Sequence, residues 1–170
     1  MSARSAAIIG SIVLGLTFGS AGASGASVAG DERVLGPRGY KSLHLGQPEP
    51  AARATGLLVD KQAGEECHYY YLRPSEGQTN VGSGVFVDPG RGVMMIGGTV
   101  KSHTPKGVTL GSRFGEVRAA YPDMRRLPPL TWVYTAAVPG NEDARYRFAF
   151  DEAGRVADFA LEAAEMGACG

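Results

Sequence analysis

Two stretches of the chain, 65 residues apart, show the same order of features, and this recurrence constrains the fold more than any other property. They are KSLHLGQPEPAARATG (41–56) and GVTLGSRFGEVRAAYP (107–122). Each begins with a short apolar segment that predicts a strand and ends in Leu-Gly, at Leu45 and at Leu110. Each continues with a polar turn and a short helical pattern that a Gly or a Pro ends.

Three candidate strands follow each helical pattern. In the first half they are 67–73, 83–88 and 93–98, and in the second half 131–138, 144–150 and 155–163. Turn residues separate them, including Asp-Pro-Gly from Asp88 and a second turn from Asp151, 63 residues later. The pattern predicts an α+β protein of two tandem repeats packed together, each a helix followed by a three-stranded antiparallel meander.

These patterns divide the whole chain. We expect a signal peptide (1–26), a flexible leader (27–39), a first repeat (40–98), a linker (99–106), a second repeat (107–164) and a tail (165–170) that carries Cys169. The N-terminus has one Arg, an apolar run from Ile8 to Phe18 and then small residues, which is the layout of a cleaved secretory signal. The alternative, a membrane anchor, needs about 20 apolar residues.

The charge balance limits the expected classes of binding partner, and the cysteine content indicates the expected cellular compartment. Removing residues 1–26 removes one Arg and no acid, which leaves 16 basic and 17 acidic residues. This near-neutral balance excludes nucleic acid and anionic membranes as expected partners. The two cysteines, Cys67 and Cys169, predict a disulfide in a secreted protein, and the alternative is a reactive thiol. We expect a soluble monomer after signal cleavage, in the extracellular or cell-wall space.

The segment 107–122 resembles the helix motif of the small outer-membrane assembly lipoproteins of the SmpA/OmlA type. The residues that carry the resemblance are Gly111, Ser112, Glu116, Val117 and Pro122. A tandem duplication of such a unit in a secreted protein is similar to the β-lactamase inhibitor protein family. That family carries a cysteine pair in each repeat, whereas this chain has one pair in all, and no inhibitory residue is carried over.

The sequence contains no pattern typical of an enzyme. The histidines His44, His68 and His103 have no His, Cys or carboxylate at a metal-ligand spacing. The Gly-rich stretch 82–92 lacks the ending of a phosphate loop, and no nucleophile elbow is present. We therefore expect no metal site, no cofactor and no catalytic activity.

Aromatic residues supply the candidate binding site. In the strand 67–73, alternation places His68 and Tyr70 on one face and Tyr69 and Tyr71 on the other. Trp132 and Tyr134 occupy the matching strand of the second half. Because both faces carry rings, one face can be core and the other can expose rings for recognition of a protein. The alternative is that all of these rings fill the core.

The sequence thus predicts a secreted, non-catalytic binding module that recognises another extracellular or envelope protein, with enzyme inhibition as one form. The candidate binding residues are His68, Tyr70, Trp132 and Tyr134, and the loops 74–80 and 139–143 are candidate contact segments. The alternatives are a structural or envelope-associated protein with no tight partner and a small enzyme with an unrecognised site.

Overall fold

The computed structural model describes residues 31–77 and 84–170, and β-strands make up most of their regular structure. The predicted signal peptide (1–26) and residues 78–80 of the candidate contact loop lie outside these residues. In chain order the first half forms β1 (Gly39–Tyr40), β2 (Leu43–His44), α1 (Glu49–Ala54), β3 (Leu58–Ala63), β4 (His68–Leu72), the 3-10 helix η1 (Pro74–Glu76), β5 (Gly84–Asp88) and β6 (Gly92–Gly97).

The second half begins with a helix and continues with four strands. Its elements are α2 (Phe114–Ala120), β7 (Arg125–Arg126), β8 (Val133–Val138), β9 (Asn141–Phe150), β10 (Val156–Ala163) and the 3-10 helix η2 (Gly167–Cys169). The segment 107–111, predicted to be a strand, contains no regular structure. Helix α2 begins after Arg113, whose backbone N–H donates to Glu116 Oε2 at 2.7 Å.

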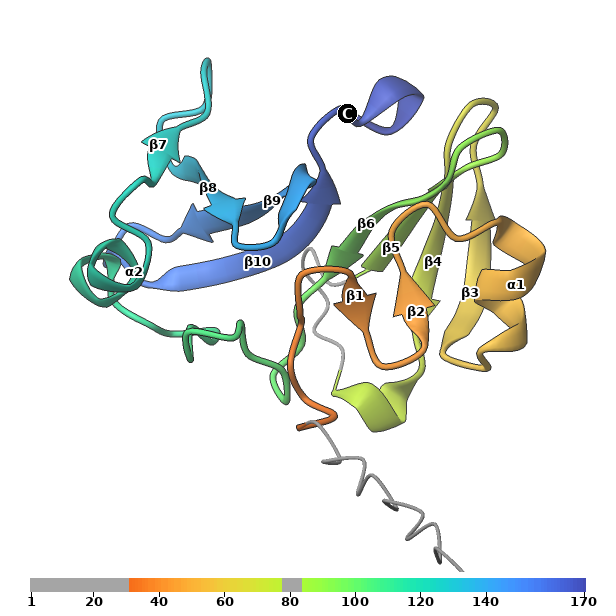
Figure 1. The fold of residues 1–170 in the computed structure, drawn as a ribbon, viewed down its shortest axis with the longest axis horizontal. Coiled ribbons are helices and arrows are strands. Elements are labelled where there is room, and N and C mark those ends of the chain that lie inside the picture. The colour runs from red at the N-terminus through yellow and green to blue at the C-terminus, as the bar shows by residue number, and fades with distance from the viewer. Residues whose placement is uncertain (1–30, 78–83) are drawn as a thin grey trace, which may run out of the picture.

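The strands β3 to β10 form one antiparallel sheet in the order β3-β4-β5-β6-β10-β9-β8-β7. Strands β1 and β2 form a small sheet of their own. In the large sheet β6 pairs with β10 through three residue pairs, which are Ala160 with Gly97, Leu161 with Ile96 and Glu162 with Met95. Figure 1 shows the groups β3–β6 and β7–β10 turned away from each other across this join.

The predicted fold class is therefore wrong. The chain is not an α+β pair of packed helix-plus-meander repeats, because a single eight-stranded sheet dominates the described residues and its two α-helices are short. Two strands that the prediction lacked, β3 and β7, extend the sheet at its outer edges. The halves are joined edge to edge by backbone hydrogen bonds and do not pack as two separate layers.

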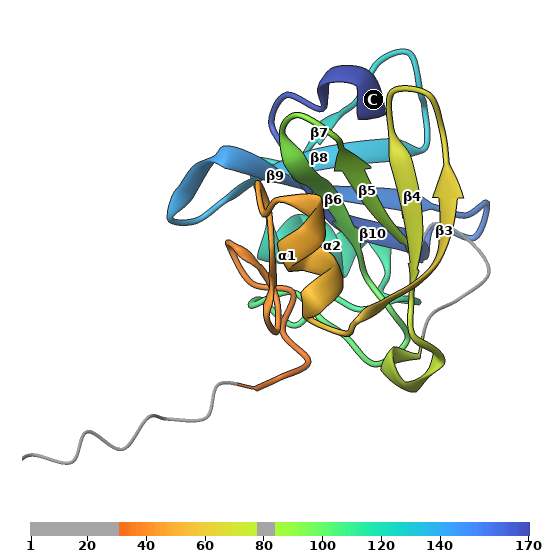
Figure 2. The same ribbon diagram turned by 90° about the vertical axis from the view of Figure 1, so that its right-hand side faces the viewer.

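One face of the sheet carries the hydrophobic core. Tyr146 and Phe148 of β9 are fully buried, and the ring of Tyr121, at the end of α2, lies 5.4 Å from each of their rings. The helices cover this face with small side chains, Ala52 from α1 and Val117 from α2, both without exposed surface. Figure 2 shows α1 in front of β6, which it contacts. Burying each large apolar side chain contributes about 1.5–3 kcal/mol.

The hairpin between β5 and β6 forms where the Asp-Pro-Gly turn predicts it. The Asp88 Oδ1 atom accepts hydrogen bonds from the backbone N–H groups of Gly90 and Arg91, at 2.8 and 3.0 Å. Gly92 then adopts a φ of 86°, which favours glycine. A Cβ atom at Gly92 would lie 2.5 Å from the carbonyl oxygen of Gln47, so glycine also permits close contact with the loop before α1.

The predicted disulfide between Cys67 and Cys169 is present. The two sulfur atoms are 2.01 Å apart and the Cα atoms 5.2 Å apart, and the bridge links residues separated by 102 positions. It ties the tail after β10 to the start of β4, and so connects the two groups of strands a second time. Within residues 31–77 and 84–170, no helix has the length and apolar character needed to cross a membrane.

Candidate functional site

The face of the large sheet opposite the core carries the candidate site. Tyr70 is buried in the core with 3% of its surface exposed, so its strand neighbours Tyr69 and Tyr71 point to the other side. The register continues this side across the sheet, since Tyr69 lies beside Phe86, and Phe86 beside Met95. Met95 in turn lies beside Glu162, and Glu162 beside Arg145. We call this surface the open face. Its members are Tyr69, Tyr71, Phe86, Met95, Arg145, Arg147, Asp158 and Glu162.

The β4–β5 side of the open face is aromatic. The ring of Tyr69 packs edge-on against Tyr71 at 5.0 Å and against Phe86 at 5.1 Å. Gly84 makes this possible, because a Cβ atom there would lie 2.1 Å from the Tyr69 ring. Burial, and then the neighbouring Tyr71, raise the pKa of Tyr69, so its hydroxyl is neutral at physiological pH. The three rings form a half-buried, uncharged surface.

The β9–β10 side of the open face is charged. The Arg145 Nε–H group donates to Glu162 Oε1 at 2.6 Å, and Arg147 Nη2–H donates to Asp158 Oδ2 at 2.5 Å. Arg147 Nε also lies 3.4 Å from Glu162 Oε2, which joins the pairs into one network. The carboxylate side chains are 4% and 9% exposed, whereas those of Arg145 and Arg147 are 30% and 21% exposed.

In both pairs the carboxylate is more deeply buried than the guanidinium group with which it pairs. Burial raises the pKa of Asp158, and the adjacent Arg147 opposes that rise by stabilising the charged form. Replacing a buried ion pair by apolar residues of similar size is often neutral or stabilising, so stability of the sheet does not by itself account for these charges. The two carboxylates do hold a pair of partly exposed arginines in fixed positions.

A groove with a volume of about 530 Å³ lies on the open face. Phe86 and Met95 line it on one side, and Arg145, Arg147 and Glu162 on the other. Leu127, after β7, and the tail residues Met166, Gly167, Cys169 and Gly170 complete its wall. The disulfide to Cys67 anchors this tail at the groove. The groove therefore combines aromatic, aliphatic and guanidinium surface in one concave site.

The structure places the predicted residues His68 and Tyr70 on the core side, against α1. The Tyr70 hydroxyl donates to Glu49 Oε1, and His68 Nδ1 lies 2.8 Å from Glu49 Oε2. Lys61 Nζ, 2.8 Å from Glu49 Oε1, completes the group. Burial favours the neutral acid, but the hydrogen bonds from Lys61, Tyr70 and His68 outweigh it and lower the pKa of Glu49 to about 2. Burial and the bond to Glu49 raise the pKa of Tyr70 to about 12.

The other two predicted residues also lie away from the open face. Tyr134 points to the core side, where its ring packs against Phe114 at 5.2 Å and Phe150 at 5.7 Å. Trp132 is 54% exposed just before β8, two residues from Tyr134. The four predicted residues therefore do not form one surface. No sequence pattern distinguishes Tyr69, Tyr71 and Phe86, the rings on the open face, as binding residues, although alternation places Tyr69 and Tyr71 opposite Tyr70.

No group of three or more His, Cys, Asp or Glu side chains that could hold a metal ion occurs within residues 31–77 and 84–170. His103 Nε2 lies 3.1 Å from Asp31 Oδ2, and its Nδ1 lies 2.9 Å from the carbonyl oxygen of Thr104. The contacts of His103 therefore join the first described residues to the segment before α2.

Comparison with known proteins informs the fold alone. No protein-family model matches the sequence, and no curated protein matches it. Among solved structures, the uncharacterised protein yfeY from Escherichia coli is similar, with a TM-score of 0.50 and 11% sequence identity. The similarity covers 76% of this chain and 99% of that chain. At this identity the comparison shows that the chains share a fold and does not assign a function.

Proposed function

We propose that this chain is a secreted, non-catalytic binding module whose open face binds another extracellular or envelope protein. The observation that carries the proposal is the groove on this face, where the half-buried ring of Phe86 lies opposite two partly exposed arginines, Arg145 and Arg147. Aromatic residues and Arg are the residue types most enriched at protein interfaces and at their energetic centres. Inhibition of a secreted enzyme is one form that this binding can take.

Arg145 retains hydrogen-bond donors that a bound protein can use. A guanidinium has five N–H donors, and Arg145 donates only through Nε to other described residues. Its terminal nitrogens therefore remain for acceptors on a bound protein. Glu162 and Asp158 hold the guanidinium groups in position beforehand, which reduces the entropy cost of ordering them on binding.

Two features support the secreted location. The N-terminal segment 1–26 has the layout of a cleaved signal, and the Cys67–Cys169 disulfide is typical of proteins in oxidising compartments. The tail that this disulfide anchors also forms part of the groove wall. Folding of the binding surface is thus coupled to formation of the bridge.

Site-specific photo-crosslinking tests the proposal. A photoreactive phenylalanine analogue replaces Tyr71, on the open face, and in a control replaces Arg118, exposed on α2. Each protein is irradiated in culture medium and envelope extract of the producing organism, with and without excess unlabelled protein. We expect one dominant product from position 71 that the excess protein removes. Equal products from both positions, or none, contradict the open face as the binding site.

The purified partner then allows the energetics to be measured. Tyr71→Ala removes a half-exposed ring from the open face, and we expect it to weaken binding about 10-fold or more. Trp132→Ala removes a more exposed ring outside that face, and we expect little change. Circular dichroism of both variants checks that the sheet is intact. Loss of affinity in Trp132→Ala alone would place the interface at the start of β8 and not on the open face.

A further inference from the structure

A second hollow, distinct from the groove, opens where β6 separates from β10. The register between these strands ends with Met95 opposite Glu162, and Met94 has no register partner in β5 or in β10. Val93 instead pairs with the loop before α1, since it accepts a hydrogen bond from the Gly46 N–H at 2.8 Å and donates to the Gln47 carbonyl at 3.0 Å. The strands therefore diverge, and a hollow of about 590 Å³ lies between them.

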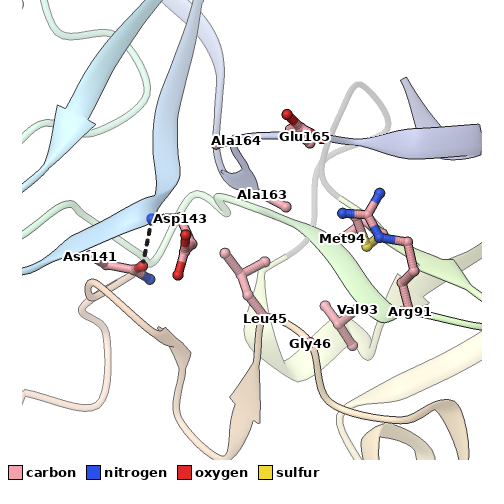
Figure 3. Close-up of a pocket in the computed structure, with 10 residues that line it drawn as sticks. All are labelled: Leu45, Gly46, Arg91, Val93, Met94, Asn141, Asp143, Ala163, Ala164 and Glu165. Atoms are coloured by element: carbon pink, nitrogen blue, oxygen red, sulfur yellow. Dashed lines mark hydrogen bonds between the residues drawn. The ribbon is translucent and has the colours of Figure 1, made fainter.

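The hollow has an apolar base and a charged rim (Figure 3). Leu45, Val93, Met94 and Ala163 supply aliphatic surface. The charged side chains come from three different elements, with Arg91 on the β5–β6 turn, Asp143 on β9 and Glu165 after β10. Ligand pockets in proteins commonly have volumes of about 300–1,000 Å³ and combine apolar walls with a few polar groups, as this hollow does.

The three charged side chains of the rim have no partners among the described residues. None of Arg91, Asp143 and Glu165 forms a side-chain hydrogen bond or an ion pair there, and all three are exposed. The groove differs, because Arg145 and Arg147 are paired with buried carboxylates. The hollow thus presents one cation and two anions that no side chain of residues 31–77 and 84–170 neutralises by an ion pair.

Asn141 holds the β9 side of this rim in place. Its Nδ2–H group donates to the carbonyl oxygen of Pro37 at 2.7 Å, and its Oδ1 atom accepts the backbone N–H of Asp143 at 3.2 Å. The backbone of Asp143 also accepts the N–H of Ala164 at 2.8 Å. These bonds connect the backbone segments that bear Asp143 and Glu165, because Ala164 directly precedes Glu165. Hydrogen bonds therefore fix the backbone on the anionic side of the hollow.

We propose that this hollow binds a short basic peptide with a free carboxyl end. The Arg91 guanidinium suits the terminal carboxylate, which it can hold with two parallel hydrogen bonds. Asp143 and Glu165 suit ammonium groups, and the aliphatic base accommodates the stem between the charges. The rim has a formal charge of −1, so a ligand with two ammonium groups and one carboxylate neutralises it. This site is independent of the proposed function of the open face.

An NMR titration of the isotope-labelled mature protein with the dipeptide Lys-Ala tests the proposal. Lys-Ala carries two ammonium groups and one carboxylate. We expect amide shifts at Val93, Met94 and Ala163, with a Kd of about 1 mM, as exposed charge pairs give weak binding. The same peptide with an amidated carboxyl end should bind about 3- to 10-fold more weakly, because it loses the contact with Arg91.

Variants at the rim separate this site from general charge effects. In Arg91→Gln the free and amidated peptides should bind equally, and in Asp143→Asn with Glu165→Gln both should lose most of their affinity. Arg118→Gln, on the exposed side of α2, is the control and should bind as the parent does. Dispersed spectra confirm folding of each variant. No shifts at about 10 mM peptide, or the same response in all variants, would overturn the proposal.

Discussion

Glu49 should control the acid stability of the first half of the sheet. Its carboxylate, 16% exposed, receives hydrogen bonds from three directions, with Lys61 on β3 and both His68 and Tyr70 on β4. These bonds join α1 to the two outermost strands on this side of the sheet. We expect Glu49→Gln, which keeps the size and removes the charge, to weaken all three bonds without creating a cavity.

The magnitude follows from the pKa. The carboxylate of Glu49 has a pKa of about 2 in the folded protein against an ordinary value of 4.5, and this difference corresponds to about 3 kcal/mol. Because the folded-state pKa is the lower one, the stabilisation is complete above pH 4.5 and disappears as the pH falls toward 2. Since Gln retains part of the hydrogen bonding, we expect a loss of about 2 kcal/mol at pH 7.

Urea unfolding followed by circular dichroism, at pH 7 and at intervals down to pH 3, measures this difference. The gap in free energy of unfolding between the parent and Glu49→Gln should be largest at pH 7 and should shrink steadily below pH 4.5. Glu142→Gln, which changes an exposed carboxylate in β9, serves as the matched control and should show no gap. A gap that is absent at pH 7, or one that is as large at pH 3 as at pH 7, refutes the reasoning.

Two further perturbations test the fold. Replacing both Cys67 and Cys169 by Ser should lower the free energy of unfolding by about 4–5 kcal/mol, because the bridge closes a loop of 102 positions. Urea unfolding of the parent protein with and without reductant should give the same loss. A loss below about 1 kcal/mol contradicts this expectation. Gly92→Ala should destabilise far more than Gly140→Ala, although φ is 86° and 81° at these positions. Only a Cβ at Gly92 meets backbone, 2.5 Å from the Gln47 oxygen, whereas the space at Gly140 is empty. Equal melting temperatures would show that the contact with Gln47 does not matter.

Local patterns predicted most of the individual elements. The strand patterns of 83–88 and 93–98 around the Asp-Pro-Gly turn and of 155–163 predicted β5, β6 and β10 to within one residue at every boundary. Turn chemistry and alternation are properties of neighbouring residues, so a sequence displays them directly. Strand β3 was not predicted because its backbone is irregular. Asp60 adopts a positive φ of 49°, and the register to β4 shifts between Val59 and Gln62, which breaks the alternation.

The assembly of these elements was not evident from the sequence. Whether β6 and β10 join into one sheet depends on long-range hydrogen bonds that leave no local pattern. The same holds for the candidate site, because alternation separates Tyr70 from Tyr69 and Tyr71 but does not say which side the helices cover. In the structure Tyr70 is 3% exposed and its hydroxyl donates to Glu49 of α1, which places Tyr70 on the side that the helices cover.

The short join between β6 and β10 has a mechanical consequence. Three residue pairs connect two groups of four strands, and the groove has walls from both groups, so the geometry of the groove depends on this join. The Cys67–Cys169 disulfide also links the two groups of strands at the edge of the groove, and this covalent link limits the distance between the groove walls. For the binding function proposed above, this means that the disulfide and the β6–β10 pairing help to set the width of the groove, although neither belongs to the proposed contact residues. Changes at these two places are expected to alter which partners fit.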